Sequence, residues 1–192
     1  MPTEADWKGL SKDFQPYLQS TEVPGSALCI VRERLNPRYG NLINYLANAQ
    51  WQEADNETLK VMLDVANRTE QGYLGLDDIK TFPCKDLQLI DHLWLKFSGG
   101  HFGFSVQKEI YLQCGGQADY EYYKEAEQRW GDRVGWREGG SWTFEIIYEL
   151  VGSPEGHLPV ESYPWLKRRG FLGGGGILSW GRWDSLLSHP GL

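Results

Sequence analysis

Short amphipathic segments that end at glycine dominate residues 41–130. Apolar side chains recur there at three- and four-residue spacing, which predicts helices that each bury one face. The four apolar faces run over Leu42–Ala49, Leu59–Ala66, Leu87–Phe97 and Val106–Cys114. Glycine follows three of them, at Gly72, Gly99-Gly100 and Gly115-Gly116, where a left-handed residue can end a helix. This pattern predicts an all-α fold with long connecting loops.

Polar residues suggest where these helices begin. Asp55–Thr58 is a candidate start for the second helix, Asp86 for the third and Ser105 for the fourth, because such side chains accept hydrogen bonds from free N–H groups. Asp119–Trp130 is expected to form a polar surface helix with Tyr122, Tyr123, Ala126 and Trp130 on its drier side. Thr143–Val151 has a mixed pattern that fits either a helix or a strand.

Composition shifts divide the chain into three parts. Residues 1–40 form an appendage or linker punctuated by proline, residues 41–160 a helical core, and residues 161–192 a glycine-rich basic segment. No apolar run reaches the length of about 18 residues that a membrane helix needs. The first residues have neither a basic start nor an apolar stretch, so we expect no signal peptide.

Charge and cysteine content narrow the functional classes. The net charge is −7, which disfavours nucleic-acid binding driven by phosphate neutralisation. The three cysteines, Cys29, Cys84 and Cys114, are odd in number and widely spaced, so we expect a reducing compartment and no disulfide framework. Cys84 and Cys114 lie in apolar helical patterns, where a buried position in the core is expected.

Common catalytic and metal motifs are incomplete. Asn67–Asp78 has the outline of a calcium loop but offers one carboxylate at the ligand positions, so a tight inter-helix loop is expected instead. The four histidines show no zinc spacing. No G-x-S-x-G elbow occurs, and no Lys-Ser or Lys-Thr follows the glycines at 173–176. The sequence therefore predicts no catalytic residue and no metal ligand.

Aromatic side chains gather in the loop-rich second half, beside a basic cluster. The chain holds 9 Trp and 10 Tyr, more than one small core needs. A flat aromatic ligand with carboxylates at its edge would stack on such rings and pair with guanidinium groups. A core role for most of these rings remains an equal alternative. The candidate ligand residues are Phe102, Phe104, Trp136, Trp142, Phe144, Trp165, Lys167, Arg168 and Arg169.

Five segments, in order, resemble the genomes-uncoupled-four (Gun-four) porphyrin-binding family, whose members regulate magnesium chelatase in chlorophyll synthesis. They are Trp51–Leu59, Ile79–Trp94, Phe102–Gln107, Arg133–Trp136 and Gly156–Pro159. The resemblance spans about residues 41–160. It implies an all-helical domain shaped like a cupped hand, with Trp142 and Phe144 as wall residues and Lys167, Arg168 and Arg169 meeting the propionates.

The same resemblance implies a ligand, a partner and a compartment. The ligand would be protoporphyrin IX or Mg-protoporphyrin IX, and the partner the large porphyrin-binding subunit of magnesium chelatase. The chain would act without catalysis, in a plastid stroma or a cyanobacterial cytosol, with peripheral contact to membranes. Two alternatives stay open: a paralogue that binds a linear bilin, and an interaction module that works without a ligand.

Overall fold

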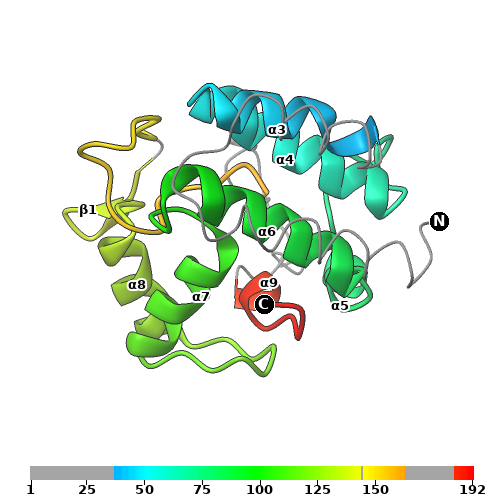
Figure 1. Cartoon of the computed structure of the whole chain (residues 1–192). Coiled ribbons are helices and arrows are strands. Elements are labelled where there is room, and N and C mark those ends of the chain that lie inside the picture. Colours follow the sequence, from blue (N-terminus) through cyan, green and yellow to red (C-terminus); the bar gives the residue numbers. More distant parts are fainter. Residues whose placement is uncertain (1–36, 144, 163–183) are drawn as a thin grey trace, which may run out of the picture.

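The computed structural model describes residues 37–143, 145–162 and 184–192 (Figure 1). Within them lie seven α-helices, a 3-10 turn and one hairpin of two short antiparallel strands. This confirms the all-α class. The elements are η1 (Pro37–Tyr39), α3 (Gly40–Ala47), α4 (Trp51–Val65), α5 (Leu76–Lys80), α6 (Cys84–Ser98), α7 (Phe104–Gln113), α8 (Lys124–Arg133), β1 (Arg137–Glu138), β2 (Ser141–Trp142) and α9 (Asp184–Leu187).

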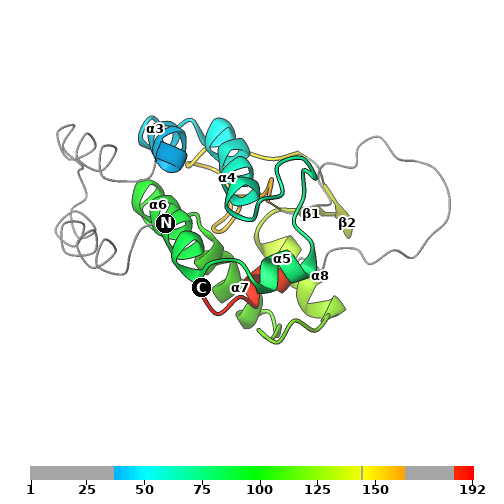
Figure 2. The same ribbon diagram turned by 90° about the vertical axis from the view of Figure 1, so that its right-hand side faces the viewer.

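Helices α3 and α4 lie side by side and both contact α6 (Figures 1 and 2). The predicted start of α4 at Asp55 is wrong, because the helix begins at Trp51. The Trp51 ring stacks on Trp94 of α6 with centroids 6.1 Å apart, so tertiary packing fixes the first turn. Asp55 is fully buried inside the helix.

Helix α6 begins at Cys84, after Pro83, rather than at Asp86. The Asp86 carboxylate accepts a hydrogen bond from the Tyr39 hydroxyl instead of capping the helix. The predicted end is confirmed, since Gly99 follows the helix in the left-handed region at φ 65°. A glycine adopts that conformation without the steric cost of a Cβ atom.

Helix α7 is capped from another helix. The predicted cap, Ser105, already lies inside the helix, which begins at Phe104. Oδ1 of Asp91 in α6 accepts the backbone N–H of Ser105 at 2.9 Å. Gly103 precedes the helix at φ 141°, where a Cβ atom would stand 2.9 Å from Asp91 Oδ1. A glycine is therefore required for this close approach.

Helix α8 begins at Lys124, five residues later than the predicted Asp119. The Asp119 carboxylate accepts the N–H of Glu121 and the hydroxyl of Tyr123, and Tyr120 has a positive φ of 63°. This local turn competes with the helix. Ala126 and Trp130 are buried as predicted, but Tyr122 is 53% exposed, so its predicted place on the drier side is wrong.

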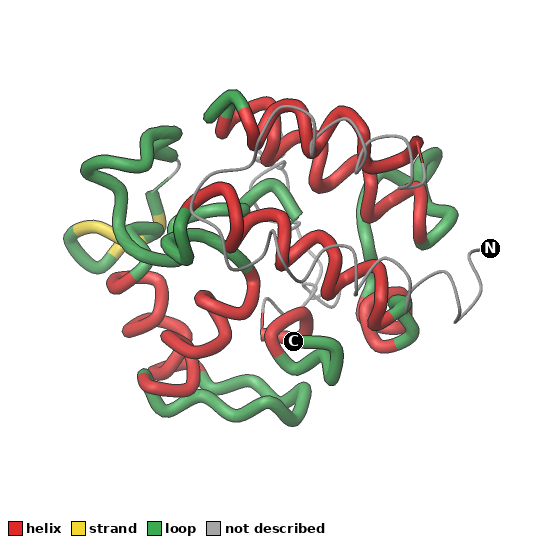
Figure 3. Tube along the Cα trace, viewed as in Figure 1, coloured by secondary structure: helices red, strands yellow, loops and turns green. Residues whose placement is uncertain are grey.

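The described residues between Thr143 and Val151 form neither helix nor strand (Figure 3). Both predicted alternatives are therefore wrong for this stretch. Residues 184–192 return to the core, where α9 contacts α5 and α7 (Figures 1 and 2). Leu186 and Leu187 are buried there.

Candidate functional site

The nine candidate ligand residues fall into three groups. Phe102, Phe104 and Trp136 have no exposed surface. Trp142 is partly buried. The other five, Phe144, Trp165, Lys167, Arg168 and Arg169, lie outside the described residues.

The buried aromatic residues belong to two core clusters. Phe102 packs edge-on against Trp51 and Trp94, with centroids 5.4 and 6.2 Å apart. Trp136 packs edge-on against Trp130 at 4.9 Å, and Tyr111 contacts Trp130 from the opposite helix, α7. Edge-to-face pairs of this kind stabilise a core. In this structure Phe102, Phe104 and Trp136 are therefore core residues with no exposed surface.

Trp142 is held on α8 by its neighbours. Arg137 stacks on the Trp142 ring, with its guanidinium carbon 5.5 Å from the ring centroid. Nη1 of Arg137 donates to both carboxylate oxygens of Asp132 at 2.9 and 3.0 Å. A Cβ atom at Gly131 would stand 2.6 Å from the ring, so glycine is needed for this contact. Trp142 is thus a partly exposed ring with a fixed position.

Residues 156–161 are held by hydrogen bonds to α4, to α7 and to the end of α8. Nε2 of Gln107 in α7 donates to the carbonyl oxygens of Gly156 and Pro159 at 3.0 and 2.8 Å. Oδ1 of Asp55 in α4 accepts the N–H groups of Val160 and Glu161 at 2.9 and 3.0 Å. The end of α8 contributes through His157. These hydrogen bonds, most of them buried, fix the position of residues 156–161.

His157 joins the end of α8 to the stretch after the hairpin. Its Nδ1 lies 2.6 Å from the Val134 carbonyl oxygen, and its Nε2 accepts the N–H of Ile147 at 3.0 Å. Its own carbonyl oxygen accepts Nε1–H of Trp136 at 2.9 Å. Burial, reinforced by His101, lowers the pKa of the imidazole, against the opposing effect of the Val134 hydrogen bond.

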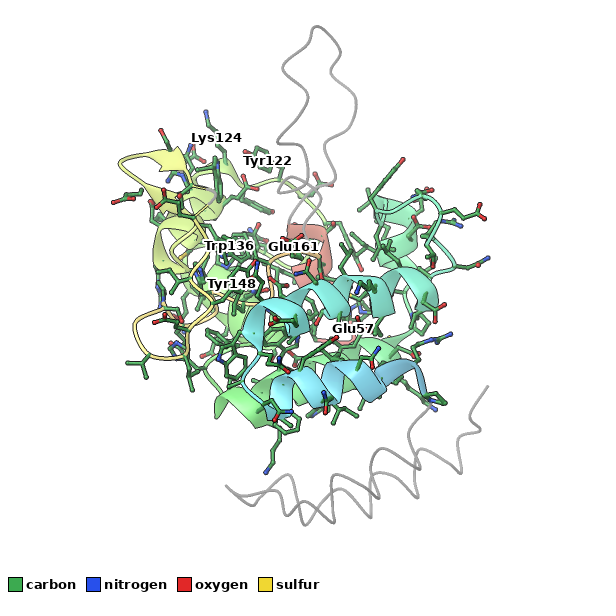
Figure 4. The ribbon with its side chains drawn as sticks, turned by 90° about the horizontal axis from the view of Figure 1, so that it is seen from above. Glu57, Tyr122, Lys124, Trp136, Tyr148 and Glu161 are labelled. Atoms are coloured by element: carbon green, nitrogen blue, oxygen red, sulfur yellow. The ribbon has the colours of Figure 1, made fainter. Side chains whose placement is uncertain are left out.

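Tyr148 lies beside two carboxylates. Burial, followed by the negative charges of Asp55 and Glu161, raises the pKa of the Tyr148 phenol well above its usual range. In Figure 4 the labelled Tyr148 and Glu161 lie near each other beside α4, in agreement with the electrostatic interaction between them. The phenol therefore stays protonated and keeps its hydrogen-bond donor in the neighbourhood of Asp55 and Glu161.

Hydrogen bonds also hold the C-terminal segment, residues 184–192, against the core. Nε2 of His189 lies 2.9 Å from the Phe82 carbonyl oxygen, and Nδ1 accepts the N–H of Gly191 at 2.9 Å. Nζ of Lys108 in α7 donates to the carbonyl oxygens of His189 and Leu192. Cys84 lies beside this segment but is exposed, so its predicted burial is wrong, because the first turn of α6 projects beyond the core. Cys114 is buried, as predicted.

Sequence reasoning did not assign site roles to Asp55, Gln107, Glu161 or His189. Asp55 was assigned to a helix start, and its true partners lie more than a hundred positions away in sequence. Gln107 and His157 belong to segments that the family resemblance identified. Their bonds show why the two segments meet: one supplies the donor amide and the other the carbonyl oxygens.

The described part of the chain contains no group of three or more histidine, cysteine or acidic side chains that could hold a metal ion. None of its helices is long and apolar enough to span a membrane. Residues 67–75 form the predicted loop between α4 and α5, but residues 76–78 already belong to α5. Asp78 in the first turn of α5 pairs with Arg68 at 2.9 Å and accepts the N–H of Gly75.

Comparison with known proteins gives a consistent result. A family model described as GUN4-like matches residues 32–169, more than half of the chain. A chloroplastic tetrapyrrole-binding protein of Arabidopsis thaliana is 39% identical over 74 residues, which are 38% of this chain and 28% of that protein. A Ycf53-like protein of Synechocystis is 31% identical over 120 residues, which are 60% of this chain and 47% of that protein. The chain thus spans about half the length, or less, of these relatives.

Solved structures resemble this fold. The ligand-free structure of Arabidopsis thaliana GUN4 superposes with a TM-score of 0.62 at 28% identity, covering 80% of this chain and 93% of that chain. The structure of GUN4 from Chlamydomonas reinhardtii gives a TM-score of 0.59 at 24% identity, covering 80% of this chain and 88% of that chain. The second of these supports the fold alone.

Proposed function

This chain belongs to the GUN4-like family, and on that premise we propose that it binds a tetrapyrrole. The single observation that carries the proposal is the family match, supported by a relative whose name states tetrapyrrole binding. The binding surface would combine the partly exposed Trp142 ring with Phe144 and Trp165. Lys167, Arg168 and Arg169 would pair with the propionate groups of the ligand.

The geometry around Trp142 agrees with this assignment. A tetrapyrrole is a wide, flat and largely apolar molecule, so its site needs aromatic faces held in place and a few polar anchors. Trp142 is fixed on α8 by Arg137 and by the absence of a side chain at Gly131. The bonds of Gln107, Asp55 and His157 fix the chain that leads to the basic cluster.

We propose further that the ligand is a cyclic porphyrin, protoporphyrin IX or Mg-protoporphyrin IX. The chain would act without catalysis, as a regulator that delivers or presents the ligand to the large porphyrin-binding subunit of magnesium chelatase. The named relatives come from a chloroplast and a cyanobacterium, which supports a plastid stroma or a cyanobacterial cytosol. A linear bilin carries the same two propionates and is the competing ligand.

A paired titration tests ligand binding. Tryptophan fluorescence and visible absorbance are followed as protoporphyrin IX, Mg-protoporphyrin IX or a linear bilin is added. We expect micromolar or tighter binding of the cyclic ligands. Binding is expected to weaken at least about tenfold in the Arg168→Ala/Arg169→Ala variant, since two charge-assisted hydrogen bonds are lost.

The matched control removes two positive charges elsewhere. Lys60 and Lys85 are exposed on α4 and α6, so the Lys60→Ala/Lys85→Ala variant should bind like the parent chain. Equal weakening in both double variants would show that the loss of net positive charge, and not the loss of Arg168 and Arg169 in particular, weakens binding. Preference for the bilin would replace the porphyrin as ligand, and binding of none of the three would refute the proposed function.

The partner is tested separately. The chain is mixed with the purified magnesium chelatase subunits, and the formation of Mg-protoporphyrin IX is measured over time. We expect a faster reaction with the parent chain and little effect of the Arg168→Ala/Arg169→Ala variant. If the chain binds porphyrin but leaves the rate of Mg-protoporphyrin IX formation unchanged, it binds the ligand without regulating the chelatase.

A further inference from the structure

Two buried histidines lie on either side of residues 163–183, and both make the same pair of contacts. His157 meets the Val134 carbonyl oxygen through Nδ1 and the Ile147 N–H through Nε2, at 2.6 and 3.0 Å. His189 meets the Phe82 carbonyl oxygen through Nε2 and the Gly191 N–H through Nδ1, both at 2.9 Å. Each ring therefore faces one acceptor and one donor of the backbone.

This pattern fixes the protonation state of both rings. A carbonyl oxygen needs a ring N–H, and a backbone N–H needs a ring lone pair, so each imidazole must be neutral. The required tautomer carries its proton on Nδ1 in His157 and on Nε2 in His189. A second ring proton would point at the N–H of Ile147 or Gly191 and would abolish that hydrogen bond.

The two rings hold different parts of the chain. His157 ties Ile147, in the stretch that follows Trp142, to Val134, the residue directly after α8. His189 ties the C-terminal segment to Phe82, two residues before the start of α6. Trp142 lies in the stretch between Val134 and Ile147, the two residues that the His157 ring joins.

We propose that neutral His157 and neutral His189 are positioning residues for the flanks that they hold, of which the His157 flank contains Trp142, and that protonation of either ring releases its flank. Acidification would then weaken ligand binding without any contact between ligand and histidine. The effect on ligand affinity rests on the proposed function, whereas the release of the two flanks does not.

The charged surroundings of both rings favour the neutral form. His101, whose Nε2 lies 3.0 Å from the Ser153 carbonyl oxygen, is the titratable group that acts on His157. Glu149 and Glu155, on the same stretch, are exposed to solvent. Burial lowers the pKa of His157, and the neighbouring His101 adds to this shift.

His189 has a comparable environment. Lys108 of α7 donates to its carbonyl oxygen. Cys84 of α6 lies against Gly191, and Tyr120 contributes its N–H to Ser188. Burial lowers the pKa of His189, and the positive charge of Lys108 lowers it further, against the opposing hydrogen bond to Phe82.

The first experiment needs no ligand. Nuclear magnetic resonance of the full chain gives the ring tautomers, the titration midpoint of each ring, and hydrogen-exchange protection of the Ile147 and Gly191 amides. We expect the Nδ1–H tautomer in His157 and the Nε2–H tautomer in His189 at pH 7.5. Protection of each amide should fall about tenfold once its ring is protonated, as the loss of one buried hydrogen bond allows.

Glutamine variants separate the two anchors. His157→Gln keeps a side-chain donor and acceptor but does not titrate, so it should remove the pH dependence of Ile147 protection and leave that of Gly191 unchanged. His189→Gln should do the reverse. His92→Gln changes an exposed histidine on α6 and should alter neither. A charged ring at pH 7.5, the opposite tautomers, or unchanged protection after ring protonation would overturn the proposal.

The second experiment measures ligand affinity. Protoporphyrin IX is titrated into the parent chain and into the His157→Gln/His189→Gln variant, at pH 7.5 and below the measured ring midpoints. On acidification, the parent chain should lose affinity about tenfold more than the variant. Because the variant lacks both titrating rings, its own loss measures the effect of protonating the porphyrin. Equal losses would overturn the role in ligand binding. If the porphyrin binds at neither pH, the proposed function fails, and the amide data still decide whether the anchors exist.

Discussion

Single buried side chains join the segments that the family resemblance identified. Gln107 is fully buried, and its amide reaches the carbonyl oxygens of Gly156 and Pro159 across about fifty residues of sequence. Asp55 and His157 make comparable bonds with backbone groups of the same stretch. These residues therefore position the chain before residue 163, while the rings of Phe102 and Trp136 fill the core.

Replacing Gln107 by leucine is expected to lower the free energy of unfolding by about 2 to 4 kcal/mol, because two buried carbonyl oxygens lose their donor. Chemical denaturation followed by circular dichroism measures the change. Gln113→Leu on the exposed side of the same helix is the control and should change stability by less than about 0.5 kcal/mol. A similar cost for both variants would contradict the assigned role of Gln107.

Helix boundaries in this fold depend on contacts between elements. Helix α7 begins where Asp91 of α6 accepts the Ser105 N–H, and α4 begins four residues before its predicted start because Trp51 packs on Trp94. The carboxyl group of Asp91 is buried, and this burial raises its pKa against the hydrogen bonds from Ser105. An isolated peptide of α7 would lack this cap altogether.

Asp91→Ala should therefore destabilise the protein by about 1 to 2 kcal/mol, the usual cost of a lost N-cap. Ser105→Ala should cost less, since the backbone N–H of residue 105 and its acceptor both remain. Thermal unfolding of the two variants gives the comparison. A larger loss of stability for Ser105→Ala than for Asp91→Ala would show that Ser105 is the N-cap, as the sequence pattern predicts.

The molecule as a whole should lose stability on mild acidification. The pKa values of His157 and His189 are both lowered in the folded state, so the unfolded chain binds more protons below its histidine pKa of about 6.5. The stabilising contribution is complete above that pH and declines as the pH falls toward the two folded-state values. Asp91, whose pKa is raised, acts in the opposite direction at lower pH.

Urea denaturation between pH 8 and pH 5 measures this dependence. The unfolding free energy of the parent chain should fall below about pH 6.5, and the fall should be smaller in the His157→Gln/His189→Gln variant. His92→Gln should follow the parent chain. A parent and double variant with the same pH profile would show that neither ring carries the effect.

Local sequence determined the all-α class, the order of helices α3, α4, α6, α7 and α8 and several of their ends, whereas the short helix α5 was not predicted. Apolar spacing at three and four residues is a property of one helix alone, and glycine at Gly99 meets a backbone requirement at that position. The five ordered segments also identified the family. These inferences needed no knowledge of which segments contact each other.

Tertiary structure decided the roles of the individual polar and aromatic residues. Whether Phe102 lines a ligand or a core, whether Asp91 or Ser105 caps α7, and whether Cys84 is buried all depend on segments distant in sequence. Asp55 illustrates the reason, because its carboxylate holds the N–H groups of Val160 and Glu161. A buried polar group must find a partner, and only the folded chain brings that partner within hydrogen-bonding distance.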